Sequence, residues 1–213
     1  MAGYPITLEL SGRHCLVVGG GAVALRKVEG LLSFGACVRV VSPNVVEELD
    51  VLASKEEVEW HRRSYESDDL KGMVLVISAT DDMEMNRRVA DDAHEFGIPV
   101  NVVDQPDLCS FTVPAVVRRG DLVIAIQTGG QSPALSRRLR ETLERQFGPE
   151  YGPYVAFLGR MRRWIHERFP DDPAARQKAA SRLAGLDLIG LFAEGKEDRA
   201  EEEAKTCILS SLD

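Results

Sequence analysis

The sequence predicts a doubly wound α/β domain followed by a mostly helical region. Through the first hundred residues, short apolar runs of strand length alternate with helical patterns. Three consecutive glycines directly follow the first of these runs. Beyond residue 113 the alternation gives way to longer helical patterns. Because strands that alternate with helices at this spacing form parallel βαβ units, we expect one parallel sheet with helices on both faces.

Each element of the α/β domain has its own signal in the sequence. Apolar and β-branched runs predict five strands, at residues 14–18, 37–41, 58–60, 74–78 and 99–103. Apolar residues at helical spacing predict the helices between them, at residues 23–32, 45–52 and 81–96. Gly35 and Gly97 follow two of these helices, where glycine commonly ends a helix. We therefore place the α/β domain at residues 12–104.

The second half of the chain predicts one more strand and several helices. The strand covers residues 122–126, and Ser132 and Pro133 are suited to be the N-cap and first residue of the next helix. Two helical patterns follow at 154–169 and 172–192, and a charge run at 194–205 is typical of a solvated helix or tail. We predict three parts: a nucleotide-binding domain (1–113), a dimerisation segment of a strand and a helix (114–148), and a small all-helical domain (149–213).

Composition excludes several classes of protein. The chain of 213 residues is 44% hydrophobic and 28% charged, which is typical of a folded globular protein. It has no run of 18 apolar residues and no secretory signal pattern, so we expect no membrane partner. The four cysteines stand far apart without a C-x-x-C pair, which favours a reduced, cytoplasmic protein.

Charge is distributed unevenly along the chain. The net charge is −9 over residues 1–113, +5 over 114–168 and −4 over 169–213. A basic middle segment suggests an anionic ligand, whereas the simpler interpretation is that its arginines only solvate a helix face. The overall net charge of −8 argues against nucleic-acid binding, which needs a strongly basic face.

The glycine run fits the pattern G-x-G-x-x-A, with Gly19, Gly20 and Gly21 followed by Ala22, Val23 and Ala24. Glycine permits the tight turn after a strand and lets a pyrophosphate approach the N-terminus of the following helix. The pattern therefore predicts a Rossmann-type dinucleotide site, the alternative being a structural turn without a ligand. Ser42 stands at the end of the second strand, where an acidic residue commonly binds the adenosine ribose, so the choice between NAD and NADP stays open.

Polar residues also follow two later strands. Ser78, Ala79, Thr80 and Asp81 end one strand, and Asp104 follows the next. Ligands of doubly wound folds bind at this carboxyl edge, where Asp104 could accept a proton during a hydride transfer. The alternative is that Asp104 caps the amides of the 108–109 segment. The four histidines are scattered, so we predict no metal site.

Three stretches carry a family resemblance. They are VVGGGAVALRKVEGLLSFGA (17–36), ATDDMEMNRRVADDA (79–93) and NVVDQPDLCSFTVPAVVRRGDLVIAIQTGGQSPALSRRLRE (101–141). In this order they resemble the precorrin-2 dehydrogenase / sirohydrochlorin ferrochelatase family, the N-terminal module of siroheme synthases. The resemblance implies a homodimeric enzyme that oxidises precorrin-2 to sirohydrochlorin with NAD and that in some members inserts Fe²⁺. Alternatives are a chelatase alone and a nucleotide-sensing domain without catalysis.

The resemblance also assigns residues to roles. Asp104 is the expected catalytic proton acceptor. The expected NAD contacts are Gly19, Gly20, Gly21, Ala22, Val23, Ser42, Ser78, Ala79, Thr80 and Asp81. Precorrin-2 is a tetrapyrrole with many carboxylates, which arginine binds well. The expected substrate contacts are Asn101, Ser110, Arg118, Arg119, Thr128, Gly129 and Arg137.

Overall fold

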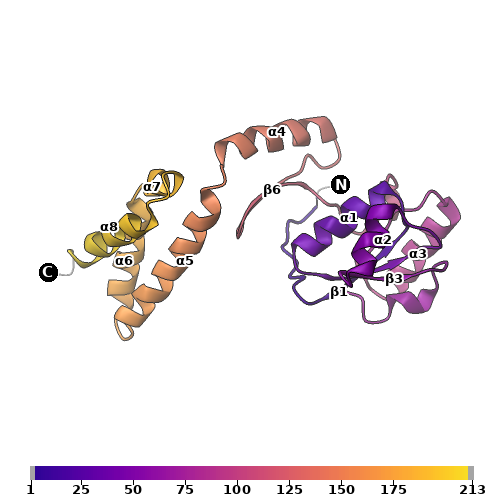
Figure 1. Ribbon diagram of the computed structural model, residues 1–213, viewed down its shortest axis with the longest axis horizontal. Coiled ribbons are helices and arrows are strands. Elements are labelled where there is room, and N and C mark those ends of the chain that lie inside the picture. Colours follow the sequence, from indigo (N-terminus) through magenta and orange to yellow (C-terminus); the bar gives the residue numbers. More distant parts are fainter. Residues whose placement is uncertain (1–2, 211–213) are drawn as a thin grey trace. The chain divides into compact units, whose positions relative to one another are not determined.

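The computed structural model describes residues 3–210, and the chain forms two compact units that divide between Val113 and Pro114 (Figure 1). Each unit is described by itself. None of the helices within residues 3–210 combines the length and the apolar character needed to cross a bilayer.

The first unit contains a five-stranded sheet in the order β3-β2-β1-β4-β5. Its strands are β1 (His14–Val18), β2 (Cys37–Val41), β3 (Val58–His61), β4 (Leu75–Ser78) and β5 (Val100–Val102). All neighbouring strands run parallel. The chain moves outward from β1 in one direction and then returns to its other side, which confirms the doubly wound, Rossmann-type sheet that the sequence predicts.

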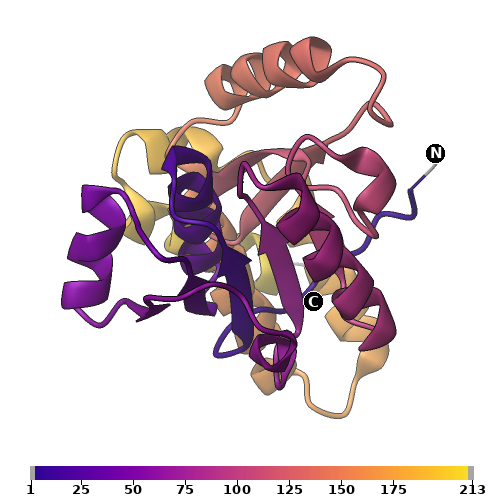
Figure 2. The ribbon, with the colours of Figure 1, turned by 90° about the vertical axis from the view of Figure 1, so that its right-hand side faces the viewer.

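Helices cover both faces of this sheet (Figure 2). They are α1 (Ala22–Ser33), α2 (Glu47–Ser54) and α3 (Met83–Glu95), with two short 3-10 turns, η1 (Ser67–Leu70) and η2 (Pro106–Leu108). Val17 packs with residues of α1 and α2, whereas Leu16 packs with residues of η1 and α3. Neighbouring residues of β1 thus enter opposite cores, as the two-residue period of a strand requires.

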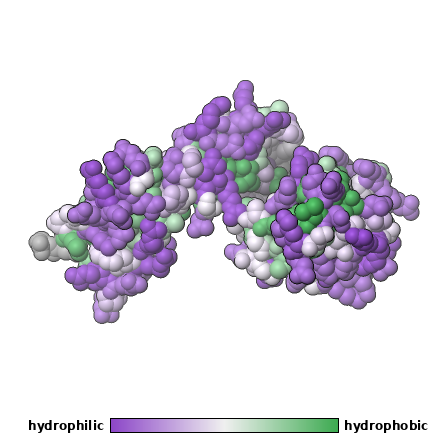
Figure 3. Space-filling model, viewed as in Figure 1, coloured by the Kyte–Doolittle hydropathy of each residue, from purple (hydrophilic) through white to green (hydrophobic). Residues whose placement is uncertain are grey.

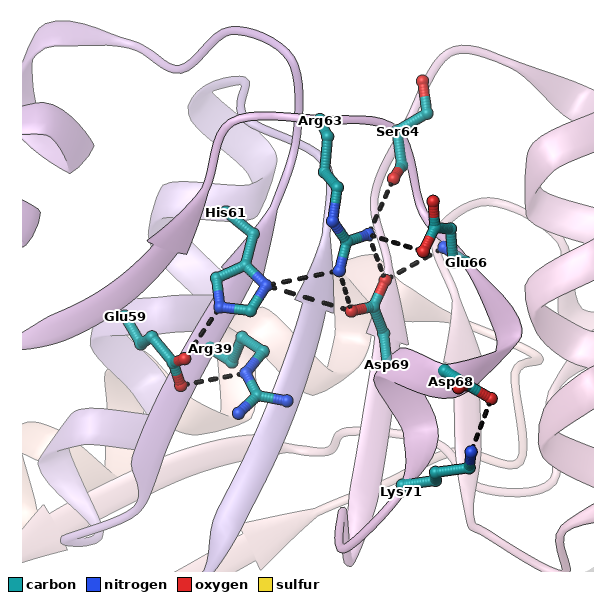
Figure 4. Close-up of polar contacts among 9 residues, drawn as sticks. All are labelled: Arg39, Glu59, His61, Arg63, Ser64, Glu66, Asp68, Asp69 and Lys71. Carbon is teal, nitrogen blue, oxygen red and sulfur yellow. Dashed lines mark hydrogen bonds and ion pairs between the residues drawn. The ribbon is translucent and has the colours of Figure 1, made fainter.

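An ion-pair cluster joins the β3 edge of the sheet to η1 (Figure 4). Arg63 donates to both carboxylate oxygens of Asp69, at 2.6 and 2.8 Å, and the Glu66 N–H donates to the same carboxylate. Burial raises the pKa of Asp69, but the hydrogen bonds from Arg63 and Glu66 outweigh burial and hold that pKa below its ordinary value. Because the Asp69 side chain is only 3% exposed, this carboxylate depends on its partners.

The second unit begins with a hairpin rather than a single strand. β6 (Ala115–Arg119) pairs antiparallel with β7 (Leu122–Ile126). The sequence analysis found only the second of these strands, so the prediction of one strand between 114 and 148 was wrong. Gly120 takes a positive φ of 57° in the two-residue turn that joins the strands, as such hairpins require.

Between Pro133 and residue 210, the second unit contains five helices: α4 (Pro133–Gln146), α5 (Tyr151–Arg168), α6 (Pro173–Gly185), α7 (Ile189–Ala193) and α8 (Glu197–Leu209). Ser132 caps α4 and Pro133 begins it, as predicted. The prediction of one continuous helix over 172–192 was wrong, because the chain is extended at Leu186 and buries Leu188 before α7 begins.

The last four helices share one apolar core. Phe157 and Met161 of α5 pack with Leu183 of α6, Phe192 of α7 and Ile208 of α8. The predicted charge run falls in α8, which buries Ala and Ile side chains on one side and exposes its charges on the other. Figure 3 shows a mostly hydrophilic surface over these helices, consistent with apolar side chains that point inward.

Replacing Asp69 with asparagine should destabilise the first unit. Asp69→Asn removes the charge that Arg63 binds, and we expect the free energy of unfolding at pH 7 to fall by about 1–3 kcal/mol. Since the pKa of Asp69 is lowered by folding, the carboxylate stabilises the fold above its unfolded-state pKa, and this stabilisation is lost as the pH falls through the folded-state pKa. The difference between native and variant should therefore be constant above about pH 5 and shrink below about pH 4.

Urea unfolding in a Trp164→Phe background, followed by the fluorescence of Trp60 on β3, measures this difference. The control is Asp68→Asn in the same 3-10 turn, because Asp68 is exposed and should cost less than about 0.5 kcal/mol. Equal destabilisation by the two substitutions would contradict the role given to the buried carboxylate.

Candidate active site

The turn between β1 and α1 has no room for side chains at its first two glycines. Gly19 has a φ of +123°, and a Cβ there would lie 2.3 Å from the carbonyl oxygen of Ala79. A Cβ on Gly20 would lie 1.9 Å from the carbonyl oxygen of Asn44. The Gly19 N–H also donates to Val41 O at 3.0 Å. These two glycines are therefore required by the packing of the chain itself.

Gly21 is a glycine for a different reason. It is the N-cap of α1, its φ of −83° suits any residue, and a Cβ there would meet nothing within 4 Å. Within residues 3–210, no side chain caps this end of α1. The N–H groups of the first turn, including those of Ala22 and Val23, together with the helix dipole make this end a seat for an anion. The residues present thus fit a dinucleotide pyrophosphate, which a side chain at position 21 would obstruct.

Ser42 lies at the end of β2 and is only 8% exposed. Its hydroxyl donates to Asn44 O at 2.6 Å, and Trp60 Nε1 donates to Ser42 O at 3.0 Å. The hydroxyl hydrogen is thus used within the chain, where it holds Asn44 against Gly20. Any contact of Ser42 Oγ with a ribose would have to use an oxygen lone pair.

The predicted cofactor residues after β4 are held by one buried amide that the sequence analysis missed. Asn86 of α3 is 2% exposed, and its Oδ1 accepts from Ser78 Oγ at 2.7 Å and from Thr80 Oγ1 at 3.1 Å. Its Nδ2 donates to Thr80 O at 3.0 Å. This network fixes the backbone of Ala79 beneath Gly19. The sequence signal was a polar residue on the apolar face of a helix.

The two consecutive aspartates after β4, Asp81 and Asp82, have different surroundings. Asp82 is the N-cap of α3 and accepts from the N–H groups of Glu84 and Met85. Asp81 is exposed beside it. Both lie at the carboxyl end of β4, beside the glycine turn.

Asp104 occupies the third position of a tight turn over residues 102–105. Its φ is +59°, a left-handed conformation that is unusual for a residue other than glycine. The turn is closed by the Gln105 N–H, which donates to Val102 O at 3.3 Å. The N–H groups of Leu108 and Cys109 donate instead to the carbonyls of Gln105 and Pro106. The alternative that Asp104 caps these two amides is therefore wrong, and its carboxylate is exposed.

Lys27 brings an amino group into the electrostatic range of Asp104. Burial on α1 lowers the pKa of Lys27, and neighbouring Arg26 lowers it further, while Cys109 and Asp104 act in the opposite direction. The sequence analysis missed Lys27. Its position within an amphipathic helix was the available signal, but its partner lies 77 residues away along the chain.

Two predicted substrate residues, Asn101 in β5 and Ser110 after η2, bond to the chain itself. Asn101 Nδ2 donates to Phe111 O at 3.0 Å. Ser110 Oγ accepts from the Val100 N–H at 2.8 Å. Both side chains thus attach the segment after η2 to β5, so the structure gives them a part in building the Asp104 turn.

The remaining predicted substrate residues belong to the second unit. Arg119 donates to Phe147 O and Glu144 O, and so it binds carbonyls at the C-terminal end of α4. Thr128 Oγ1 accepts from the Ser132 N–H at the start of α4, and Gly129 has a φ of +60° in the same loop. Arg118 and Arg137 are exposed, and Arg137 pairs with Glu141 one turn along α4.

Among residues 3–210, no group of three or more His, Cys, Asp or Glu side chains is arranged to hold a metal ion. The carboxyl edge of the sheet presents backbone N–H donors at the start of α1 and exposed carboxylates after β4 and β5.

Comparison with protein families agrees with this geometry. The family model for NAD(P)-binding matches residues 6–115, and the model for the central part of sirohaem biosynthesis proteins matches residues 119–146. The solved structure of SirC, a precorrin-2 dehydrogenase, superposes with a TM-score of 0.75 at 29% identity, covering 95% of this chain and 99% of SirC.

Curated relatives carry the name siroheme synthase. The protein from Thioalkalivibrio sulfidiphilus is 41% identical over 99% of this chain, and that from Nitrosospira multiformis is 40% identical over 92%. The chain covers 43% and 42% of those two proteins, so it spans less than half of their length. The chain therefore belongs to the family of NAD(P)-binding domains, as its glycine motif predicts, and it is similar to siroheme synthases and to the precorrin-2 dehydrogenase SirC.

Proposed function

We propose that this protein is an NAD-dependent dehydrogenase that oxidises precorrin-2 to sirohydrochlorin in siroheme biosynthesis. One observation carries the proposal: a helix N-terminus bare of side chains and an exposed carboxylate stand at the carboxyl edge of the same sheet. The likeness to SirC, which extends over nearly all of both chains, supports this substrate. No observation on the described residues favours chelation, so the proposal is confined to dehydrogenation.

The oxidation of precorrin-2 removes two hydrogens, one as a hydride and one as a proton. Bound NAD⁺ supplies a hydride acceptor. The N–H groups at the start of α1 bind the pyrophosphate, and Gly21 leaves the space for it. The exposed carboxylate of Asp104 takes the proton, because a carboxylate within reach of the substrate can act as a general base.

Paired cations favour NAD over NADP. Near the ends of β2 and β3, Arg39 pairs with Glu59 at 2.9 Å, and Arg63 pairs with Asp69. Arg62 lies 3.2 Å from Asp50 and stacks on the ring of Trp60. Since NADP sites commonly bind the 2′-phosphate with an arginine, the pairing of these three guanidinium groups with carboxylates supports a cofactor without that phosphate.

The second unit supplies the proposed contacts to the substrate carboxylates. Arg118 and Arg137 are exposed, as a cation that binds a large polyacid requires. Thr128 and Gly129 shape the loop before α4, which we assign to a further contact with the substrate. Arg119 supports this segment through its bonds to α4.

We further propose the assembly and location of the protein. Exposed Val123 on β7 and exposed Leu135 and Leu139 on α4 are suited to pair with a second copy, with residues 114–148 as the dimerisation segment and 149–213 as the helical domain. All four cysteines are free thiols, which supports a cytoplasmic enzyme.

Asp104→Asn should abolish most of the turnover. Asparagine adopts the left-handed conformation readily, so the turn is retained while the base is removed. We expect kcat to fall by about 10²–10⁴-fold with an unchanged Kd for NAD⁺. The measurement is NADH absorbance with precorrin-2 generated in situ. Asp107→Asn, an exposed carboxylate in η2, is the matched control, and a native-like kcat for Asp104→Asn would refute the assigned role.

Gly21→Ala should separate folding from cofactor binding. The added methyl group meets no atom of the chain, so the melting temperature should stay within about 2 °C of the native value, whereas the Kd for NAD⁺ should rise at least about tenfold. Gly20→Ala is the contrasting variant, because its methyl group collides with Asn44 and should lower the melting temperature. Calorimetry and ligand titration measure both effects, and unchanged NAD⁺ binding by Gly21→Ala would place the cofactor elsewhere.

The preference for NAD can be measured on the native protein. We expect NAD⁺ to give a kcat/KM for precorrin-2 oxidation at least about tenfold above that with NADP⁺, since a 2′-phosphate would have to displace a carboxylate from an arginine. Arg39→Ala should leave this preference unchanged, because Arg39 is already paired with Glu59 in the native protein. A native preference for NADP⁺ would show that these ion pairs open for the phosphate.

A further inference from the structure

The thiol of Cys109 lies inside the turn that carries Asp104. Cys109 Sγ accepts from the Val102 N–H at 3.1 Å and lies 3.2 Å from Val102 O and 3.3 Å from Gln105 O. Asn101 Nδ2 donates to the same sulfur at 3.6 Å. The sulfur thus contacts the first and the last residue of the turn, Val102 and Gln105. A thiol can make these contacts because it is both a weak donor and a weak acceptor.

The turn itself needs this support. Asp104 adopts φ +59°, which costs free energy for a residue with a side chain. The backbone bond that closes the turn, from Gln105 N to Val102 O, is 3.3 Å long, beyond the usual range for an N–H···O bond. The second non-glycine residue with positive φ in the described chain, Glu56, is just past the C-terminus of α2, where that conformation is common. Asp104 has no helix end to explain its conformation.

Hydrogen bonds of Ser110 and of the Cys109 backbone hold the segment that carries the sulfur. The Ser110 N–H donates to Val100 O at 2.9 Å, and Ser110 Oγ accepts from the Val100 N–H. The Cys109 N–H donates to Pro106 O at 3.2 Å. Because residues on both sides of Cys109 bond to the backbone, its sulfur is a fixed point against which the turn can be set.

The other cysteines have no comparable surroundings. Cys15 is a buried residue of β1, and burial, with a smaller contribution from Cys37, raises the pKa of its thiol to about 11. Cys37 is exposed at the start of β2. Cys109 alone among the four cysteines contacts the turn after β5. Together with Asp104 it raises the pKa of Lys27, against the lowering caused by burial.

We propose that Cys109 is a positioning residue, whose thiol holds the 102–105 turn in the conformation that directs the Asp104 carboxylate toward the substrate. This inference rests on the proposed function of Asp104 as proton acceptor. Cys109 itself touches neither the substrate nor the cofactor in this scheme. Its contribution acts entirely through the direction and restraint of the neighbouring carboxylate, which a displacement of about 1 Å would impair.

The test compares Cys109→Ala and Cys109→Ser in the full chain. We expect Cys109→Ala to lower kcat for precorrin-2 oxidation about ten- to a hundredfold, with KM and the Kd for NAD⁺ within about twofold of native. Serine keeps a donor and an acceptor at this position, so Cys109→Ser should recover most of the loss. Cys37→Ala is the matched control and should behave as native.

A double-variant cycle distinguishes positioning from a general structural effect. If Cys109 acts through Asp104, Cys109→Ala should cause no further loss of kcat in the Asp104→Asn background, measured in single turnovers with excess enzyme. An equal loss in both backgrounds, or a parallel rise of the Kd for NAD⁺, would overturn the proposal. So would a native kcat for Cys109→Ala.

Hydrogen exchange keeps the inference testable apart from the reaction. The Gln105 amide should exchange at least about tenfold faster in Cys109→Ala than in the native protein, while the amides of β1 are unchanged. Unchanged exchange at Gln105 would overturn the role of the thiol in the turn. Absence of NADH formation by the native protein, with faster exchange in the variant, would instead refute the proposed function and leave the thiol a structural role only.

Discussion

The contact between the glycine turn and two neighbouring loops is the constraint on which the site depends. Gly19 lies against the carbonyl of Ala79, and Gly20 lies against the carbonyl of Asn44, at distances that exclude any side chain. Ser42 donates to the Asn44 carbonyl, and Asn86 bonds to Ser78 and Thr80, the residues on either side of Ala79. The first two glycines therefore serve packing, and that close packing places the third at an open helix end, where a ligand can bind.

This arrangement changes the role expected of several predicted cofactor residues. Ser78 and Thr80 bond to Asn86, and Ser42 donates to Asn44, so their hydroxyl hydrogens are committed within the chain. Their proposed part in binding NAD is to shape the surface on which backbone groups meet the cofactor. A pattern of small polar residues at strand ends is thus compatible with a site whose strongest ligands are N–H groups.

The sequence predicted the first unit better than the second for physical reasons. Strands buried on both faces are continuous apolar runs, and the glycine turn marks the first of them, so the parallel sheet was recognisable. The hairpin strand at 115–119 begins after a proline and ends in two arginines. It therefore lacks the alternation of apolar and polar residues by which a strand is recognised. The break at Leu186 depends on the burial of Leu188 against other helices, which no local pattern records.

The same distinction applies within the site. Asp104 was predictable because it directly follows an apolar strand, and the structure removes the competing interpretation by giving the Leu108 and Cys109 amides other partners. Cys109, Lys27 and Asn86 were not predicted as site residues. Lys27 and Asn86 lie on amphipathic helices, but only the fold brings them near the residues on which they act, and Cys109 supports a turn whose shape the sequence does not indicate. The left-handed conformation of Asp104 links these cases. A residue that is kept in this conformation against its preference requires supporting groups. A search of the sequence for catalytic residue types does not select these groups.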